Sequence, residues 1–279
     1  MARQRPPEVT QEDREAYARD GAVCLRGVYD RADTEALLEA WDRLVADPEA
    51  FGLRTASQER RETGPQANIV SRPSFKVPAF KNFLANSPVP ALLGALTGSS
   101  YIGFYWDAIF AKDAGSTAPT TWHNDSGASA VKGRRRPNAW TPLTPTTPEN
   151  GLEVIAGSHK WQALYWPRSP NSARLEAPPD RPMCPDFEER RDDPDLTFLG
   201  WEMEPGDILV VHPFTNHFSR GNRTDQRRVA YATWWYGDDV VWDPRPECEE
   251  GHPEAPYAQM PAGEHPNHPY FPIRWRADN

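Results

Sequence analysis

The N-terminal third of the chain carries apolar side chains at the three- and four-residue spacing of helices. Residues 10–20 open with a Thr-Gln-Glu-Asp capping pattern and stop at a glycine, which predicts a short helix, and residues 22–28 predict a short strand after it. A second helix is expected from Asp33, because its apolar positions repeat along one face. These positions are Leu37, Leu38, Trp41, Leu44 and Val45. Residues 47–80 are polar and proline-bearing, which predicts a loop, and residues 89–96 predict a further short helix.

Beyond this helical part the pattern changes to short apolar runs bounded by Gly, Pro, Asn or Asp. Runs of this length predict the strands of an antiparallel barrel or sandwich. The expected strands cover residues 101–111, 139–143, 151–155, 208–212 and 228–236. Residues 167–199 and the tail after the last strand are rich in proline, which predicts long excursions over the surface. We therefore expect one domain, residues 1–279, with a mostly helical part (1–100), a β core (101–240) that carries the 167–199 insertion, and a proline-rich surface tail (241–279).

Composition and charge narrow the class of partner. The 279 residues include 40 Asp and Glu against 31 Lys and Arg, a net charge of −9, whereas nucleic-acid binding needs a surplus of basic side chains. No apolar run approaches the roughly 18 residues that cross a bilayer, and the N-terminus has no apolar signal region. The three scattered cysteines suit a reducing compartment without a disulfide framework. We expect a cytoplasmic protein, a monomer or homodimer, that acts on a small molecule and binds neither nucleic acid nor a membrane.

The most informative polar pattern is the His-Asn-Asp sequence from His123 to Asp125. Residues i and i+2 of an extended strand point the same way, so an imidazole and a carboxylate can meet there while Asn124 faces away. A second imidazole is available at His217, which follows a predicted strand. Two histidines and one carboxylate on one face of a metal are typical of non-haem Fe(II) oxygenases, since other coordination positions stay open. His-x-Asp occurs often by chance, so this pattern alone remains a hypothesis.

A basic pair follows His217 and starts an apolar strand. Arg228 lies eleven residues beyond that histidine, directly before the run from Val229 to Trp235. A guanidinium that faces a cavity needs an anionic partner. A dicarboxylate cosubstrate that chelates the metal through its keto-acid end would bring its second carboxylate to such a residue. The alternative is that Arg227 and Arg228 only decorate the end of a strand.

Several motifs follow one another in a fixed order. They are a helix and strand at 16–28, His123-x-Asp125, Asn150-Gly-Leu-Glu-Val-Ile-Ala-Gly-Ser-His159, Gly206-Asp207 with His212, His217-x-Ser219-x-x-Asn222, and Arg228. In this order and spacing, the chain from Thr10 to Gly237 resembles the phytanoyl-CoA dioxygenase family of Fe(II)- and 2-oxoglutarate-dependent oxygenases. The resemblance implies a mainly β fold with flanking helices, the double-stranded β-helix or cupin-like jelly roll, which agrees with the strand pattern.

The resemblance also implies the composition of the cofactor site. Fe(II) is expected on His123, Asp125 and His217, with 2-oxoglutarate and O2 as cosubstrates. The residues that match family positions beside 2-oxoglutarate are Arg228 as the carboxylate anchor, Ser219 as the hydroxyl that assists it, Trp140, and Asn124 where the family often has Gln. His212 is expected to be structural, because the distal ligand of the family matches His217.

The implied activity is oxidation of a C–H bond. The simplest outcome is hydroxylation of an unactivated C–H of a small or medium-sized organic molecule, such as a secondary-metabolite intermediate, with release of succinate and CO2. The same cofactor chemistry can end in cyclisation, desaturation or epimerisation. A non-catalytic jelly-roll binding module and a zinc hydrolase are alternatives from other classes. Halogenation is not expected, because halogenating family members have a small residue in place of Asp125.

Substrate contacts are expected from one strand and one basic triplet. Trp106 and Phe104 fall on the same face of the predicted strand 101–111 by period-two alternation, so both are candidates to line the cavity. Arg134 opens the triplet Arg134–Arg136. This triplet either recognises an anionic group of the substrate or is a solvated loop.

Overall fold

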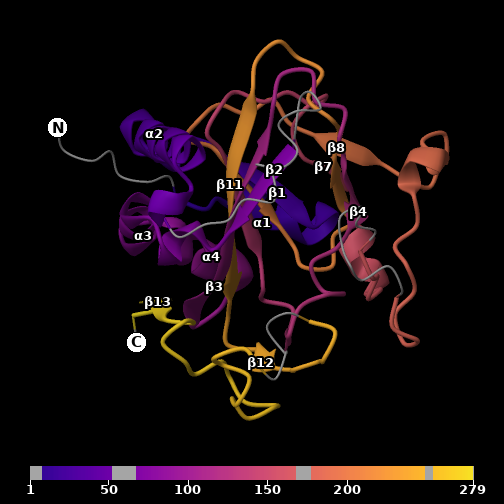
Figure 1. Cartoon of the computed structure of the whole chain (residues 1–279). Coiled ribbons are helices and arrows are strands. Elements are labelled where there is room, and N and C mark those ends of the chain that lie inside the picture. Colours follow the sequence, from indigo (N-terminus) through magenta and orange to yellow (C-terminus); the bar gives the residue numbers. More distant parts are fainter. Residues whose placement is uncertain (1–7, 52–66, 168–176, 249–253, 279) are drawn as a thin grey trace.

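Two antiparallel sheets face each other as a jelly roll, and helices cover the outer face of the larger sheet (Figure 1). The computed structural model describes residues 8–51, 67–167, 177–248 and 254–278. The larger sheet has the order β1 (Ala22–Leu25), β9 (Ile208–Val211), β6 (Asn138–Pro142), β11 (Arg228–Tyr236), β3 (Tyr101–Lys112) and β13 (Ile273–Arg276), and β2 (Ala67–Ser71) also pairs with β3. The smaller sheet has the order β4 (Thr120–His123), β10 (His217–Ser219), β7 (Glu153–Ile155) and β8 (Phe198–Gly200). A short ribbon pairs β12 (Val241–Trp242) with β5 (Val131–Lys132). The predicted fold class is confirmed.

The helices bury their apolar faces against the larger sheet. The α-helices are α1 (Gln11–Asp20), α2 (Arg31–Ala46), α3 (Pro78–Ala85) and α4 (Val89–Thr97), and the short 3-10 turns are η1 (Glu49–Phe51), η3 (Pro73–Phe75), η4 (Ser158–Trp161) and η5 (Phe187–Arg190). Phe80 of α3 meets Tyr231 of β11 edge-on, with the ring centroids 5.1 Å apart, and Leu37 of α2 belongs to the same buried cluster. Within the described part of the chain, no helix has the length and apolar content that a membrane span requires.

Both ends of the predicted first helix are confirmed. The Thr10 hydroxyl accepts a hydrogen bond from the Asp13 backbone N–H at 3.1 Å, and the Asp13 carboxylate accepts one from the Thr10 backbone N–H at 2.8 Å. Gly21 ends the helix at φ 78°, a left-handed conformation that favours glycine. The two further predicted helices are present as α2 and α4, but α2 begins at Arg31 with Asp30 as its N-cap, so Asp33 lies in its first turn and does not cap it.

The expectation of a loop over 47–80 is wrong for its second half. The structure has β2, η3 and the start of α3 there, whereas residues 52–66 lie outside the described residues. Pro78 occupies the first turn of α3, where its missing N–H costs nothing. The proline therefore marks the start of a helix, which Phe80 and Phe83 anchor in the core.

The 167–199 insertion contributes to the smaller sheet. Residues 168–176 lie outside the described residues. From residue 177 onward, the insertion buries Phe187 in η5 and leads into β8, where Leu199 pairs with Val154 of β7. This part of the insertion is therefore packed onto the jelly roll.

The proline-rich tail is attached to the β core at a few positions. β13 pairs with the start of β3 in the register Ile273↔Gly103. Tyr257 and Phe271 are only 4% and 2% exposed, and both rings pack against Trp242. Most other residues from 254 to 278 are partly or fully exposed, so the tail runs over the surface between these anchors.

Candidate active site

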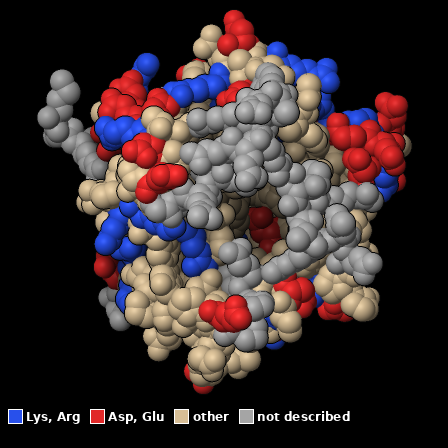
Figure 2. Space-filling view, viewed as in Figure 1, with Lys and Arg blue, Asp and Glu red and all other residues tan. Residues whose placement is uncertain are grey.

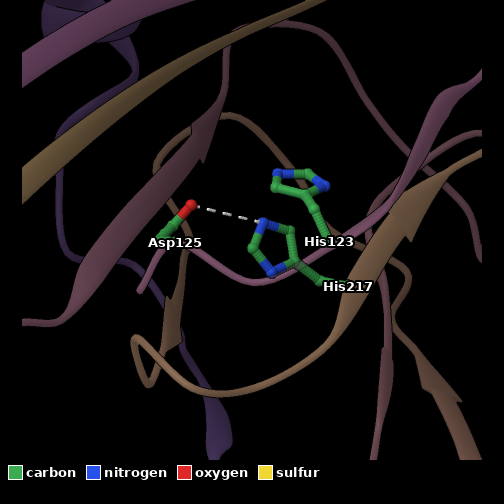
Figure 3. Close-up of side chains that lie close together, drawn as sticks. All are labelled: His123, Asp125 and His217. Carbon is green, nitrogen blue, oxygen red and sulfur yellow. Dashed lines mark ion pairs between the residues drawn. The ribbon is translucent and has the colours of Figure 1, made fainter. Parts of the chain in front are cut away.

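The smaller sheet brings the three predicted metal ligands together. β4 ends at His123 and β10 begins at His217, and these two residues are direct partners across the antiparallel pair. Asp125 follows β4 by two residues, and its Oδ1 lies 3.8 Å from Nε2 of His217. One ligand atom from each of the three residues lies within 4.8 Å of the others, and Figure 3 shows the side chains clustered around one point.

Backbone carbonyls orient both imidazoles. Nδ1 of His123 donates to the carbonyl of Thr121 at 2.7 Å, and Nδ1 of His217 donates to the carbonyl of Thr215 at 3.0 Å. Because a carbonyl oxygen only accepts, each Nδ1 carries a proton, which leaves Nε2 as the ring atom that faces the cluster and can bind a metal. Both rings are therefore set up as metal ligands through Nε2.

The carboxylate of Asp125 is held by one of its two oxygens. Oδ2 accepts hydrogen bonds from the indole N–H of Trp234 at 2.8 Å and from the Asn138 amide at 3.4 Å. Burial disfavours the charged carboxylate, but His217, His123 and the Trp234 N–H outweigh it and lower the pKa of Asp125. Burial and the neighbouring His217 lower the pKa of His123 to about 4. Two imidazoles and one carboxylate are a donor set that fits Fe(II).

Two buried basic side chains lie at the other end of β10 and β11 and define what we call the cation pocket. Arg228 and Lys112 face each other across β11 and β3, and they are only 2% and 3% exposed. Arg228 donates from Nη2 to the Ser219 hydroxyl at 3.0 Å, and Lys112 donates from Nζ to the Ser219 carbonyl at 2.9 Å. Burial lowers the pKa of Arg228 to about 10, and burial together with Arg228 lowers that of Lys112 to about 6. Such a pair favours an anionic ligand, because a carboxylate would compensate the charges.

Sequence comparison matches the model of the family described as phytanoyl-CoA dioxygenase (PhyH) to residues 17–230, most of the chain. The chain belongs to the phytanoyl-CoA dioxygenase family. It is thus a 2-oxoglutarate-dependent non-haem iron dioxygenase, with Fe(II) as cofactor and 2-oxoglutarate and O2 as cosubstrates. The resemblance seen in the motifs is confirmed.

Solved structures with the same fold accompany this family match. The non-heme alpha-ketoglutarate-dependent carbocyclase SnoK from nogalamycin biosynthesis superposes with a TM-score of 0.72 at 20% identity, over 97% of this chain and 99% of that one. The epimerase SnoN from the same biosynthesis has a TM-score of 0.69 at 17% identity, over 95% and 98% of the two chains. EctD from S. alaskensis with 2-oxoglutarate and 5-hydroxyectoine has a TM-score of 0.63 at 19% identity, over 82% and 76%. At these identities the likeness concerns the fold.

Three of the four predicted cosubstrate residues lie in the cation pocket of this PhyH-family enzyme, namely Arg228, Ser219 and Trp140. Ser219 bridges Arg228 and Lys112, and the ring centroid of Trp140 lies 5.8 Å from the Arg228 guanidinium. Asn124 is buried on the opposite side of the chain from His123 and donates to the Ala163 carbonyl at 2.9 Å. The expected contact of Asn124 with 2-oxoglutarate is therefore wrong, because strand alternation turns its side chain away.

Lys112 is a site residue that the sequence patterns did not reveal. It ends β3 and shares a face with Trp106, Ala108 and Phe110, since side chains two apart on a strand point the same way. The feature of the sequence that could have revealed Lys112 is a lysine at the end of a strand face that is otherwise apolar. Its register partner Arg228 makes it part of the cation pocket.

Of the two aromatic side chains expected to line the cavity, Trp106 and Phe104, only Trp106 lies on the inner face of β3; with Trp234 it forms what we call the aromatic wall. Trp234 pairs with Trp106, but the next residue Trp235 pairs with Phe104, so Tyr105 is the extra residue of a β-bulge. The bulge turns Phe104 to the helix-covered face, where it is 3% exposed with its ring centroid 5.5 Å from that of Trp235. The predicted cavity position of Phe104 is therefore wrong. Trp106 stays on the inner face with Trp234, which contacts the Asp125 carboxylate.

The arginine triplet is divided among different environments. Arg134 has an exposed side chain and donates its backbone N–H to Asp239 at 2.8 Å, while Arg135 forms an ion pair with Asp238. Arg136 is buried and donates to the Ser126 hydroxyl at 3.1 Å. The triplet therefore does not act as one patch, and Arg134 has the solvated-loop environment.

His212 lies outside the metal cluster. Its Nδ1 accepts a hydrogen bond from the Phe214 backbone N–H at 3.2 Å, and its ring packs against His159 with the centroids 5.0 Å apart. Burial and His159 lower the pKa of His212 to about 3, so the ring stays neutral. This environment fits the structural role expected from the sequence.

Figure 2 shows a hollow near the middle of one face with acidic atoms at its floor. A cavity of about 630 Å³ lies beside the smaller sheet, with Trp122 and Phe218 among its lining residues. The rings of Trp122 and Phe218 alternate along β4 and β10 with His123 and His217, so they point away from the metal cluster.

Proposed function

We propose that His123, Asp125 and His217 bind Fe(II) and that this enzyme hydroxylates a C–H bond of a small or medium-sized organic molecule. The observation that carries the proposal is the convergence of two Nε2 atoms and one carboxylate oxygen, with one ligand atom per residue within 4.8 Å of the others. Fe(II) at this point supplies the O2 chemistry that couples decarboxylation of 2-oxoglutarate, to succinate and CO2, with oxidation of the substrate.

Arg228 and Lys112 bind the distal carboxylate of 2-oxoglutarate. Within the described residues, Nε of Arg228 has no hydrogen-bond partner, and a carboxylate offers the missing acceptor. Ser219 supports both cations, because its hydroxyl accepts from Arg228 and its carbonyl accepts from Lys112. Trp140 forms the apolar side of this pocket.

The residues around the metal orient the substrate and exclude water. Trp234 and Asn138 hold Oδ2 of Asp125, which leaves Oδ1 directed at the metal position. Trp106 and Trp234 form an apolar wall beside it, and such a wall keeps a reactive centre dry.

The neighbouring structures support a natural-product intermediate as substrate and ring closure or epimerisation as a second outcome. The two neighbours that cover 97% and 95% of this chain are a carbocyclase and an epimerase from nogalamycin biosynthesis. EctD, which is described with 5-hydroxyectoine, supports hydroxylation. The absence of a disulfide among Cys24, Cys184 and Cys248, all described residues, supports a reducing, cytoplasmic location.

Anaerobic spectroscopy tests the metal and cosubstrate assignment directly. Fe(II) and 2-oxoglutarate added without O2 are expected to give a visible metal-to-ligand charge-transfer band in the wild type and none in His217→Ala. His265→Ala is the matched control, since this exposed histidine lies outside the metal cluster, with its ring against Tyr101 and its Nδ1 on the Val240 carbonyl. With O2 and substrate, succinate is expected to form and to disappear with His217→Ala.

The same experiment separates the alternative classes. A binding module gives no succinate with any substrate, and a zinc hydrolase needs neither 2-oxoglutarate nor O2. Undiminished turnover or an unchanged band in His217→Ala would refute the assignment.

A further inference from the structure

Arg72 places a positive charge beside the indole of Trp106. Its guanidinium lies 3.9 Å from the ring centroid of Trp106 and 5.0 Å from that of Tyr257, and it donates to the Tyr257 hydroxyl. Within the described residues it makes no direct ion pair, although its charge helps to lower the pKa of the buried Asp107 carboxyl. The side chain is half-buried, so this charge is partly removed from water.

The backbone at Arg72 is strained in a way that fixes the side chain. Arg72 has φ 55° and ψ 45°, a left-handed conformation that bulky residues rarely adopt. The strain is held by the neighbouring strand, because the Arg72 backbone N–H donates to the Asp107 carbonyl at 2.7 Å and the Ser74 N–H donates to the Asp107 carboxylate at 2.9 Å. Strain of this kind costs of order 1–3 kcal/mol and tends to occur where a side chain must be aimed.

Arg72 lies two side chains from the metal centre. It stacks on Trp106, Trp106 is the register partner of Trp234, and Trp234 donates to the Asp125 carboxylate at 2.8 Å. The side chains of Trp106 and Trp234 are only partly buried, although both are large and apolar. Phe110, on the same face of β3 as Trp106, is also only partly buried. Trp106 and Trp234 therefore connect the guanidinium to the carboxylate of the metal cluster.

We propose that Arg72 binds a carboxylate of the substrate while an aromatic ring system lies against Trp106 and Trp234, so that the enzyme acts on an aromatic or polycyclic carboxylic acid. Arginine suits this role because its planar fork holds a carboxylate through two parallel hydrogen bonds. Stacking on an indole leaves the edge of the guanidinium free to donate, and the Tyr257 hydroxyl keeps it in place. This inference rests on the proposed function, since it assigns the substrate of the same site.

Matched acid and amide probes test the charge requirement. The protein is loaded anaerobically with Fe(II) and 2-oxoglutarate, and binding of 2-naphthoate and 2-naphthamide is measured by calorimetry. The wild type is expected to bind the acid at least about tenfold more tightly than the amide, because a hydrogen bond to a charged group adds about 1.5–3 kcal/mol. Arg72→Gln is expected to lose that preference, with amide binding unchanged, and Arg72→Lys to keep part of it.

Two further variants separate charge from ring contact. Arg276→Gln is the control, because Arg276 also stacks on a ring, that of Tyr101 at 5.5 Å, but is exposed on β13. It is expected to behave as the wild type. Trp106→Leu is expected to weaken binding of acid and amide alike.

The outcomes distinguish this inference from the proposed function. If Arg72→Gln keeps the preference for the acid, or if the wild type binds the acid no better than the amide or not at all, the inference is overturned. The charge-transfer band serves as the independent readout, and it is expected to form equally in the wild type and Arg72→Gln. Absence of the band in the wild type contradicts the proposed function instead.

Discussion

The indole N–H of Trp234 donates to Oδ2 of Asp125 over 2.8 Å, so a residue of the larger sheet fixes the one carboxylate of the metal cluster in the smaller sheet. The bond occupies the oxygen that points away from His217 and leaves Oδ1 toward it. Hydrogen bonds of this kind set the orientation and charge of a metal ligand. The two sheets are thereby coupled at the reactive centre.

Trp234→Phe is expected to weaken Fe(II) binding about 10- to 100-fold, because the carboxylate loses its fixed orientation while the wall keeps a ring. Anaerobic titration followed by the charge-transfer band measures this affinity. Trp161→Phe is the control, since this tryptophan is 44% exposed and lies in η4, outside the metal cluster. An unchanged affinity in Trp234→Phe would show that the indole N–H has no part in holding the metal.

Arg228→Gln is expected to raise the Kd for 2-oxoglutarate by about 30-fold or more, because truncating one partner of a buried charge pair costs about 2–5 kcal/mol. The adjacent Arg227→Gln provides a close control, as Arg227 is exposed and pairs with Asp42. Calorimetric titration of 2-oxoglutarate into the anaerobic Fe(II) protein gives both constants. Equal losses in the two variants would contradict the assignment of Arg228 as the anchor.

Lys112 predicts a pH dependence of cosubstrate binding. Its pKa is lowered to about 6, so the free enzyme holds the amine largely neutral above that pH. An incoming carboxylate favours the charged amine, so binding takes up a proton and the affinity for 2-oxoglutarate falls as the pH rises from 6 toward the ordinary value of 10.5. Calorimetry in buffers of different ionisation enthalpy counts the proton, which is expected to vanish in Lys112→Met. Proton uptake that persists in that variant would assign it to another group.

Metal removal is expected to lower the melting temperature. A ligand present at a hundredfold excess over its Kd stabilises the folded state by about 2.7 kcal/mol, which corresponds to a few degrees for a chain of this size. Differential scanning fluorimetry with Mn(II) as a redox-stable substitute, against chelator, measures the shift. Asp125→Ala is expected to abolish it, and a full shift in this variant would place the ion elsewhere.

Gly21→Ala is expected to destabilise the fold by about 1–3 kcal/mol. A Cβ at Gly21 would lie 2.3 Å from both Nδ1 of His159 and Oγ1 of Thr215, in addition to the strain of φ +78°. Gly27→Ala separates these causes, because φ is +59° there but no atom lies within 4 Å of the added Cβ. Urea unfolding of both variants reports the difference, and equal losses would mean that the clash is relieved without cost.

The metal cluster was predictable because its signal is local. His123 and Asp125 lie two apart on an extended segment, so their convergence follows from strand geometry, and the motif order added His217. The hydrogen bonds that orient the rings of His123 and His217 are also local, because each accepting carbonyl lies two residues before its histidine.

The features that were missed depend on pairing between distant segments. The bulge at Tyr105 reverses the face of Phe104, and period-two alternation cannot reveal it because nothing in the strand itself marks the extra residue. Lys112 can be assigned to the site only once its pairing with Arg228 across β3 and β11 is known. The strands β4 and β10 are short and polar, so they lack the apolar alternation that identified the longer strands.

β3 pairs with segments from both sides of the metal ligands in the sequence. β2 pairs with one end of β3 and β13 with the other, while the Tyr257 hydroxyl accepts a hydrogen bond from Arg72. A nascent polypeptide in which residues 254–276 are still inside the ribosome lacks the contacts of β13 and Tyr257. Emergence of this segment is thus the step that completes the proposed substrate side of the site.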